Sequence, residues 1–315
     1  MKKKLITILV PCYNEEENVI HTYNLLKKIT QKISSCRFEF IFVDNGSNDR
    51  TKYLIKKLAG KDKSLIGIFL SRNFGPEGSG QAGYDAAHGD ALIGLAADLQ
   101  DPPDMIPKFI RMWQKGFDAV IGIYKNKSDD NFVIFNLRKA FYFIFHKIAS
   151  IDVPVNSTGY GIYGSKILNA LKLLPEKYRF TRGLTAWVGF NKTYLFYEKR
   201  KRTRGISKYN FYQYMKVAER GLFGFSYLPL DIMIYFGILL VLLSFIFILF
   251  YIIYVSIFGN PIKGSVTLLV SILFFGGIQL LSTSIIGKYI QVIMEETKRR
   301  PVYIIDETVN YKRKP

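Results

Sequence analysis

Two long apolar stretches near the C-terminal end restrict the fold of this chain more than any other feature. The first runs from residue 229 to residue 256, and the second from about residue 266 to residue 293. Each exceeds the ~20 residues that a helix needs to cross a bilayer, and Gly259-Asn260-Pro261 provides a turn between them. We expect a two-helix transmembrane hairpin within residues 226–293. In the tail, residues 294–315, we expect a short strand or a brace against the preceding domain.

The charges around the apolar stretches predict the orientation of the hairpin. Basic residues precede the first stretch and follow the second, whereas the connecting loop carries only Lys263. Because basic flanks stay on the cytosolic side, we expect a multi-pass protein of the inner (plasma) membrane with residues 1–225 and both termini in the cytosol. Small residues would let helices approach closely within the hairpin or between subunits, so we expect a homo-oligomer. These residues are Gly276, Gly277, Ser282 and Ser284.

The composition indicates an anionic partner. The chain has 44 lysines and arginines against 25 acidic residues, which gives a formal net charge of +19. Such an excess favours nucleic acid, anionic lipid or a phosphorylated substrate. The apolar stretches favour membrane lipids. We expect no nucleic-acid partner, because the sequence has no helix-turn-helix, zinc-finger or RNP signature.

Short β-rich segments alternate with helical patterns in the first part of the chain. Strands are predicted at residues 5–10, 38–44, 65–70, 91–97 and 119–124, and a later one at 192–197; helices are predicted at 15–33, 51–58, 81–88 and 107–115. Alternation of this kind produces a mostly parallel sheet with helices on both faces. The predicted fold class is therefore α/β, in a cytosolic domain of residues 1–225.

The segment from Ala91 to Pro103 predicts a metal site. It begins as an apolar strand and changes abruptly to acidic, amide and proline residues. Because side chains alternate along an extended strand, Asp98 and Gln100 would point the same way at its carboxyl end, where α/β sheets bind ligands. Two oxygen ligands suit Mg²⁺ or Mn²⁺ that also binds nucleotide phosphates. The alternative is an acidic loop that caps the helix starting near Met105.

Polar residues follow the second and third strands as well. Asp44 and Asn45 could reach the base and ribose of a nucleotide, and Arg72 could meet a phosphate. The glycines at positions 75, 78, 80 and 83 match neither a P-loop nor a GxGxxG spacing, so we expect them in a flexible loop.

Two further segments have the character of a membrane surface. Residues 131–150 combine apolar and aromatic residues with a basic edge that includes Arg138, which suits a helix lying on lipid or, equally, an ordinary packed helix. Residues 199–208 are strongly basic and could attract both anionic lipid and a pyrophosphate. Residues 209–225 are expected to form an aromatic amphipathic helix at the interface.

Five motifs in succession resemble family-2 glycosyltransferases. They are LVPCYNE at 9–15, VDNGS at 43–47, SRNFG at 71–75, ADLQDPP at 97–103 and RGL at 182–184. With RTRGISKY at 202–209 and the hairpin, they resemble more narrowly the polyprenyl-phosphate branch, which includes dolichol-phosphate mannose synthase and bactoprenol glucosyltransferase. The resemblance implies a GT-A fold and a set of donor-site residues: uridine held by Pro11, Tyr13, Glu15 and Asp44, metal at Asp98 and Gln100, and phosphates under Arg202, Ser207 and Lys208.

Three positions depart from the family pattern. Relatives usually carry Asp at the position of Ala96, completing an Asp-x-Asp motif, and often carry Asp at the position of Asn45. Many also have an acidic acceptor residue in a Thr-Gly-Asp-Phe motif, where this chain has Tyr160. No acidic residue can therefore be carried over there, although Asp101 could partly substitute.

The residues and the resemblance predict an inverting enzyme that moves one sugar from a nucleotide sugar, UDP-glucose or another UDP-hexose, to a polyprenyl phosphate (undecaprenyl phosphate) at the cytosolic membrane face. A phosphate monoester, with its second pKa near ~6, is already an anionic nucleophile at neutral pH, so charge neutralisation matters more than a strong base. Candidate catalytic residues are Asp98, Asp101, Arg202 and Lys208. Candidate acceptor-phosphate residues are Arg138, Arg202, Ser207 and Lys208.

Two other functions stay open. A processive polysaccharide synthase would normally carry a Gln-x-x-Arg-Trp motif, and neither Trp113 nor Trp187 lies in one. A non-catalytic membrane protein with a degenerate nucleotide site is indicated by Ala96 and Asn45.

Overall fold

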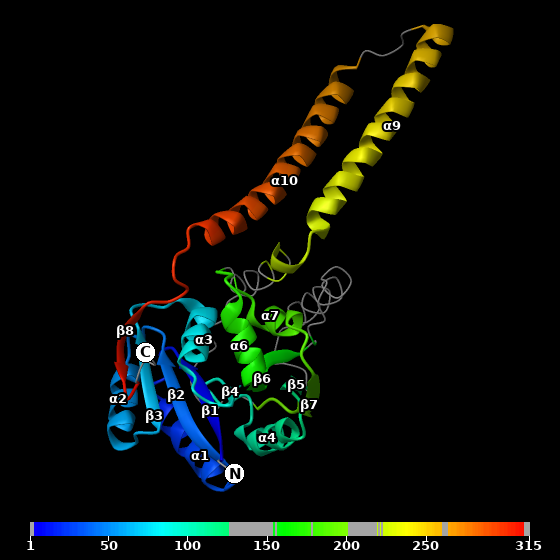
Figure 1. Cartoon of the computed structure of the whole chain (residues 1–315). Coiled ribbons are helices and arrows are strands. Elements are labelled where there is room, and N and C mark those ends of the chain that lie inside the picture. Colours follow the sequence, from blue (N-terminus) through cyan, green and yellow to red (C-terminus); the bar gives the residue numbers. More distant parts are fainter. Residues whose placement is uncertain are drawn as a thin grey trace.

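The computed structural model consists of an α/β domain from which two long helices extend (Figure 1). It describes residues 3–125, 154, 156–177, 179–200, 219, 221, 223–259 and 264–311. The strands are β1 (Lys4–Cys12), β2 (Cys36–Asp44), β3 (Leu65–Leu70), β4 (Ala91–Gly94), β5 (Ala119–Tyr124), β6 (Ser157–Gly164), β7 (Lys192–Tyr197) and β8 (Ile305–Val309). The helices are α1 (Val19–Gln31), α2 (Thr51–Lys61), α3 (Gly75–Ala86), η1 (Pro103–Met105), α4 (Ile106–Gln114), α6 (Ser165–Leu173), α7 (Thr181–Trp187), α9 (Leu228–Phe258) and α10 (Ser265–Thr297).

The strands form one mixed, mostly parallel sheet in the order β7-β5-β6-β4-β1-β2-β3-β8. Strands β3, β2, β1 and β4 run parallel, whereas β6 is antiparallel to both β4 and β5, and β8 is antiparallel to β3. The chain builds outward from β1 to β2 and β3, then returns to place β4 on the other side of β1. This reversal creates a topological switch point between β1 and β4, the usual ligand position in such sheets.

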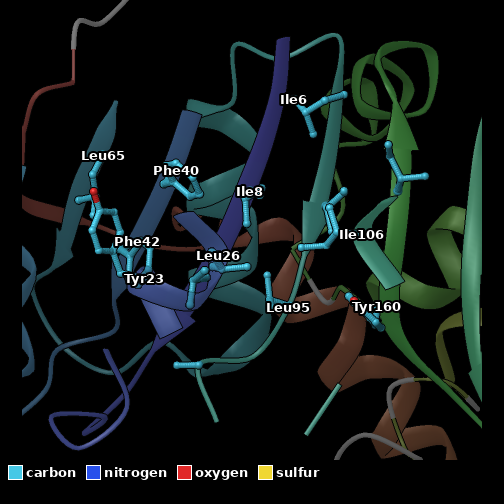
Figure 2. Packing of buried hydrophobic residues seen from close by; sticks show 14 of the residues in the cluster. Ile6, Ile8, Tyr23, Leu26, Phe40, Phe42, Leu65, Leu95, Ile106 and Tyr160 are labelled. Carbon is cyan, nitrogen blue, oxygen red and sulfur yellow. The ribbon is translucent and has the colours of Figure 1, made fainter. Parts of the chain in front are cut away.

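Strand alternation divides the core between the two faces of the sheet. Ile6 and Ile8 of β1 pack with Leu26 of α1 and Ile106 of α4 (Figure 2). Leu9, which follows Ile8, packs on the opposite face with residues of α3 and α6. Burying each such side chain contributes about 1.5–3 kcal/mol. The prediction of an α/β sheet covered by helices on both faces is confirmed.

The expectation of a flexible glycine loop after β3 is wrong. Gly75 begins α3 with φ +79° and Pro76 follows at the first helical turn, a position that suits proline. Gly83 is required by packing, because a Cβ there would lie 2.1 Å from Leu9 Cδ1. The glycines therefore bring a helix close to the sheet.

The apolar C-terminal region forms two helices. Within the part of the chain that the structure describes, α9 alone is long and apolar enough to cross a bilayer, judged by length and composition. Helix α10 runs back toward the α/β domain (Figure 1). The two-span hairpin thus remains a prediction. The helix expected at residues 131–150 lies outside the described residues, as does most of the one expected at 209–225.

The tail returns to the sheet, and the prediction of a short strand there is confirmed. Strand β8 pairs with β3, and Lys56 Nζ lies 2.6 Å from Glu307. Just before β8, the Ser71 backbone N–H donates to the Ile304 carbonyl oxygen at 3.0 Å. Because Ser71 directly follows β3, the chain leaving α10 is joined to the carboxyl edge of the parallel strands.

Candidate active site

The loops after β1 and β2 are tied to each other at the carboxyl edge of the sheet. The Asn14 backbone N–H donates to Ser47 Oγ at 2.8 Å, and the Glu15 backbone N–H donates to Thr51 Oγ1 at 2.8 Å. In return, the Asn48 backbone N–H donates to Asn14 Oδ1 at 2.9 Å. The structure thereby brings the segment that contains Pro11, Tyr13 and Glu15 next to the one that begins at Asp44.

Asp44 is a buried carboxylate at the end of β2. Its side chain is 1% exposed and accepts from the Ser47 backbone N–H at 3.3 Å. Burial raises the pKa of Asp44, and the hydrogen bonds from Ser47 offset part of that rise. A carboxylate at this edge has the acceptor oxygens to which a nucleobase N–H or a ribose hydroxyl can donate.

Asn45 and Arg72 belong to one connected loop system. Asn45 is 4% exposed, and its side chain binds the segment from Asn73 to Gly75. Arg72 is exposed and stacks on the Phe74 ring, with its guanidinium carbon 4.1 Å from the ring centroid. Its Nη1 donates to the Asn73 carbonyl oxygen at 3.0 Å. The carboxyl ends of β2 and β3 therefore carry a buried carboxylate, Asp44, and an exposed cation, Arg72.

The segment after β4 differs from the extended strand end that we predicted. Strand β4 stops at Gly94, and Leu99 has φ +55° in a turn. The prediction that strand alternation would point Asp98 and Gln100 the same way is therefore wrong. The turn still holds the two residues together, because the Gln100 backbone N–H donates to Asp98 Oδ1 at 3.3 Å. Ala96 is exposed, so an acidic side chain would fit at that position.

Asp101 is the most enclosed carboxylate of this turn. It is 7% exposed and accepts from the Tyr197 hydroxyl at 2.5 Å and from Thr158 Oγ1 at 3.2 Å. Burial raises the pKa of Asp101, an effect that hydrogen bonding from Tyr197 and the charge of Lys199 partly offset and that the charge of Asp98 increases. Sequence reasoning missed Tyr197 and Thr158 because β6 and β7 lie far from residue 101 in the sequence.

The basic segment starts directly against this turn. The Arg200 backbone N–H donates to the Gln100 carbonyl oxygen at 2.8 Å, and the Arg200 guanidinium pairs with Asp104. Lys199 lies over the Tyr124 ring, 5.6 Å from its centroid. The structure therefore adds Lys199 and Arg200 to the candidate site. Four predicted residues lie outside the described residues: Arg138, Arg202, Ser207 and Lys208.

The oxygen ligands near the turn fit a divalent cation that shares its coordination with a substrate. Asp98 contributes a carboxylate to this turn and Gln100 an amide oxygen, and both are ligand types that Mg²⁺ and Mn²⁺ bind. Within the described ranges, no group of three or more His, Cys, Asp or Glu side chains forms a metal cluster. Mg²⁺ and Mn²⁺ suit such a site, because they bind through one or two protein oxygens plus phosphates and water.

Comparison with known proteins identifies the family. Residues 7–171 match the family model described as Glycosyl transferase family 2. The bactoprenol glucosyl transferase of Shigella phage SfV is 36% identical over 300 residues, which cover 95% of this chain and 97% of that protein. The prophage bactoprenol glucosyl transferase homolog of Escherichia coli (strain K12) is 35% identical over 300 residues, with 95% and 98% covered.

The similarity to solved structures is weaker than the similarity to these two relatives. The crystal structure of residues 1–349 of S. aureus TarS with UDP-GlcNAc is 18% identical, has a TM-score of 0.40, and covers 69% of this chain and 66% of that one. The family assignment depends instead on the family match and the near-complete coverage of the curated relatives. The chain is a transferase that belongs to glycosyltransferase family 2, in the branch of the bactoprenol glucosyl transferases.

Proposed function

We propose that this transferase moves a single sugar from a UDP-hexose, such as UDP-glucose, to a polyprenyl phosphate at the cytosolic face of the membrane. The donor binds at the carboxyl edge of β1, β2 and β3. The acceptor keeps its prenyl chain in the bilayer and presents its phosphate to the turn that contains Asp98 and Asp101. Direct attack of that phosphate on the sugar inverts the anomeric centre.

One observation carries the proposal: the long helices α9 and α10 are attached at the carboxyl edge of the sheet. Ser71, next to Arg72, binds the chain that leaves α10, and Lys177 donates its backbone N–H to the Glu296 carboxylate of α10 at 2.8 Å. Just before α9, the Phe225 ring packs against the Phe180 ring, with 6.1 Å between the ring centroids. The start of α9 and the end of α10 therefore lie on the side of the domain where this edge is (Figure 1). A lipid-borne phosphate needs a site at that level.

On the donor side, different residues bind the nucleoside, the diphosphate and the metal. Asp44 accepts hydrogen bonds from the nucleoside in its buried position, with Pro11, Tyr13 and Glu15 lining the same edge. Arg72 binds the diphosphate, because guanidinium groups bind phosphate strongly and with defined geometry. Asp98 and Gln100 would hold Mg²⁺ or Mn²⁺, which when bound supplies positive charge to the departing diphosphate.

The acceptor-side residues supply positive charge from the basic segment. The start of this segment lies beside the turn, because the Arg200 backbone N–H donates to the Gln100 carbonyl oxygen at 2.8 Å. Arg202, Ser207 and Lys208 follow within a few residues and bind the acceptor phosphate together with Arg138. No strong general base is required, because the phosphate monoester is a nucleophile at neutral pH.

The test uses the purified full chain in lipid nanodiscs. Release of nucleoside diphosphate is measured from a panel of UDP- and GDP-sugars, with polyprenyl phosphate, with the dephosphorylated polyprenol, or with no acceptor. We expect rapid release from one UDP-hexose only in the presence of polyprenyl phosphate and a divalent cation. Equal release with the polyprenol or with no acceptor would overturn the proposed acceptor. Release from a GDP-sugar alone would overturn the proposed donor.

A further inference from the structure

Asn45 is the centre of a buried hydrogen-bond network between the ends of β2 and β3. Its Nδ2 donates to Asn73 Oδ1 at 3.1 Å and to the Gly75 carbonyl oxygen at 3.0 Å. Its Oδ1 accepts from the Phe74 backbone N–H at 2.9 Å. A side-chain amide has two donor hydrogens and one acceptor oxygen, and here all of them are used. The side chain is therefore committed to the segment from Asn73 to Gly75.

An aspartate at position 45 could not make the same contacts. Its carboxylate would keep the acceptor for Phe74 but would face two further acceptors, Asn73 Oδ1 and the Gly75 carbonyl oxygen. A buried acceptor left without a donor costs about 1–3 kcal/mol, and more when charged. In this loop arrangement the amide thus supplies two donor contacts that a carboxylate would lack.

Both groups that hold Arg72 belong to the segment fixed by Asn45. The guanidinium stacks on Phe74 and donates to the carbonyl oxygen of Asn73. The turn after Asn45 also packs closely against the Arg72 backbone, because a Cβ on Gly46 would lie 2.5 Å from the Arg72 carbonyl carbon. Any displacement of the segment would therefore move the cation.

We propose that Asn45 is a positioning residue that acts through Asn73 and Phe74 to fix Arg72 for the diphosphate of the nucleotide. The proposal depends on the function proposed above, since it takes the ligand of Arg72 to be a nucleoside diphosphate. Asn45 itself need not touch the ligand. Its amide determines whether the arginine is held in place before the ligand binds.

The test measures UDP affinity, by calorimetric titration without acceptor, for the full chain in nanodiscs. Asn45→Asp should weaken UDP binding about tenfold at pH 8, the scale of one lost hydrogen bond to a charged group. The defect should shrink as the pH falls toward 5.5, because a protonated carboxyl regains one donor. Arg72→Ala should weaken binding at every pH, and the double variant should bind no more weakly than Arg72→Ala alone.

Two further variants separate positioning from general damage. Asn48→Asp places the same charge in the same turn on an exposed side chain, while the backbone N–H of residue 48 keeps its hydrogen bond to Asn14 Oδ1, and should leave UDP affinity unchanged. Asn73→Ala removes one partner of Asn45 without a buried charge, and should give a smaller, pH-independent loss even if Asn45→Asp fails to fold.

Three results would overturn the inference. They are additive losses in the double variant, a pH-independent defect in a folded Asn45→Asp protein, and wild-type affinity in Asn73→Ala. Failure of the wild-type protein to bind either UDP or GDP would instead overturn the proposed function, and the inference with it.

Discussion

Two tyrosine–aspartate hydrogen bonds in this molecule have the same length, but the pKa values of the two aspartates are shifted in opposite directions. Tyr23 in α1 donates to Asp62 at 2.5 Å, and Tyr197 in β7 donates to Asp101 at 2.5 Å. The pKa of Asp62 lies well below its ordinary value, whereas that of Asp101 lies above it. The same contact therefore accompanies a carboxylate that is easy to ionise and one that is hard to ionise.

The difference comes from what surrounds each pair. Burial acts to raise the pKa of Asp62, but hydrogen bonds from Lys27, at 2.5 Å, and from Tyr23 and Ser64 outweigh it. At Asp101 burial is deeper and outweighs Tyr197, Lys199 and Thr158. Asp62 is thus a stabilising element of the fold. The ionised form of Asp101 is disfavoured by burial, as is common for functional groups.

The largest effect is expected for the proposed metal ligands beside Asp101. Asp98→Asn and Gln100→Ala should each lower turnover at least ~100-fold, because several kcal/mol of charge stabilisation in the transition state are lost, and a chelator should abolish wild-type activity. Thermal unfolding should be unchanged. Asp118→Asn, at the amino end of β5, is the control and should retain turnover. Near-normal metal-dependent activity in both ligand variants would contradict the assignment.

Removing each tyrosine hydroxyl tests the comparison directly. Tyr197→Phe deletes a bond that favours the ionised form of Asp101, so the pKa of Asp101 should rise further. Turnover at neutral pH should fall roughly tenfold, the scale of one hydrogen bond to a charged group, and the acid limb of the pH–rate profile should move to higher pH. Tyr23→Phe should leave both turnover and profile unchanged. Identical profiles for the two variants would remove the distinction between the pairs.

The smallest effect is expected for the stability that Asp62 supplies. Its pKa is lower in the folded chain than in the unfolded one, so its ionised form stabilises the fold above pH ~4, and this contribution is lost as the pH falls through the folded value. Asp62→Asn should lower the free energy of unfolding by about 1 kcal/mol at pH 7, since the pair is partly exposed. Denaturant unfolding at pH 7 and pH 3 measures this, and a loss that is no smaller at pH 3 would contradict the account.

The first part of the sheet could be predicted from the sequence because its signals are local. Strands β1, β2 and β3 are rich in apolar residues, and the polar residues at their carboxyl ends identified Asp44, Asn45 and Arg72. Helix α3 was predicted too short, at 81–88, because its glycines were taken as loop formers, whereas Gly83 allows the close contact with Leu9.

The second part of the sheet could not be predicted in the same way. Strand β6 contains glycines and is antiparallel, so its pattern differs from that of the earlier strands. Asp101 obtains its partners from β6 and β7, and only the folded chain brings them together. Ala96 and Asn45 left open a non-catalytic protein, an alternative that membership in a transferase family contradicts. The hydrogen bonds of Asn45 account for the amide at its position.

The central claim is that the carboxyl edge of this sheet transfers a sugar to a lipid phosphate. The most direct measurement is the mass of the lipid formed when the purified chain, in nanodiscs that contain undecaprenyl phosphate, is given UDP-glucose and Mg²⁺. The account predicts undecaprenyl phosphate heavier by one hexose, formed by the wild-type protein and not by Asp98→Asn. A lipid that carries several hexoses, or unmodified lipid with every UDP-hexose tried, would contradict it.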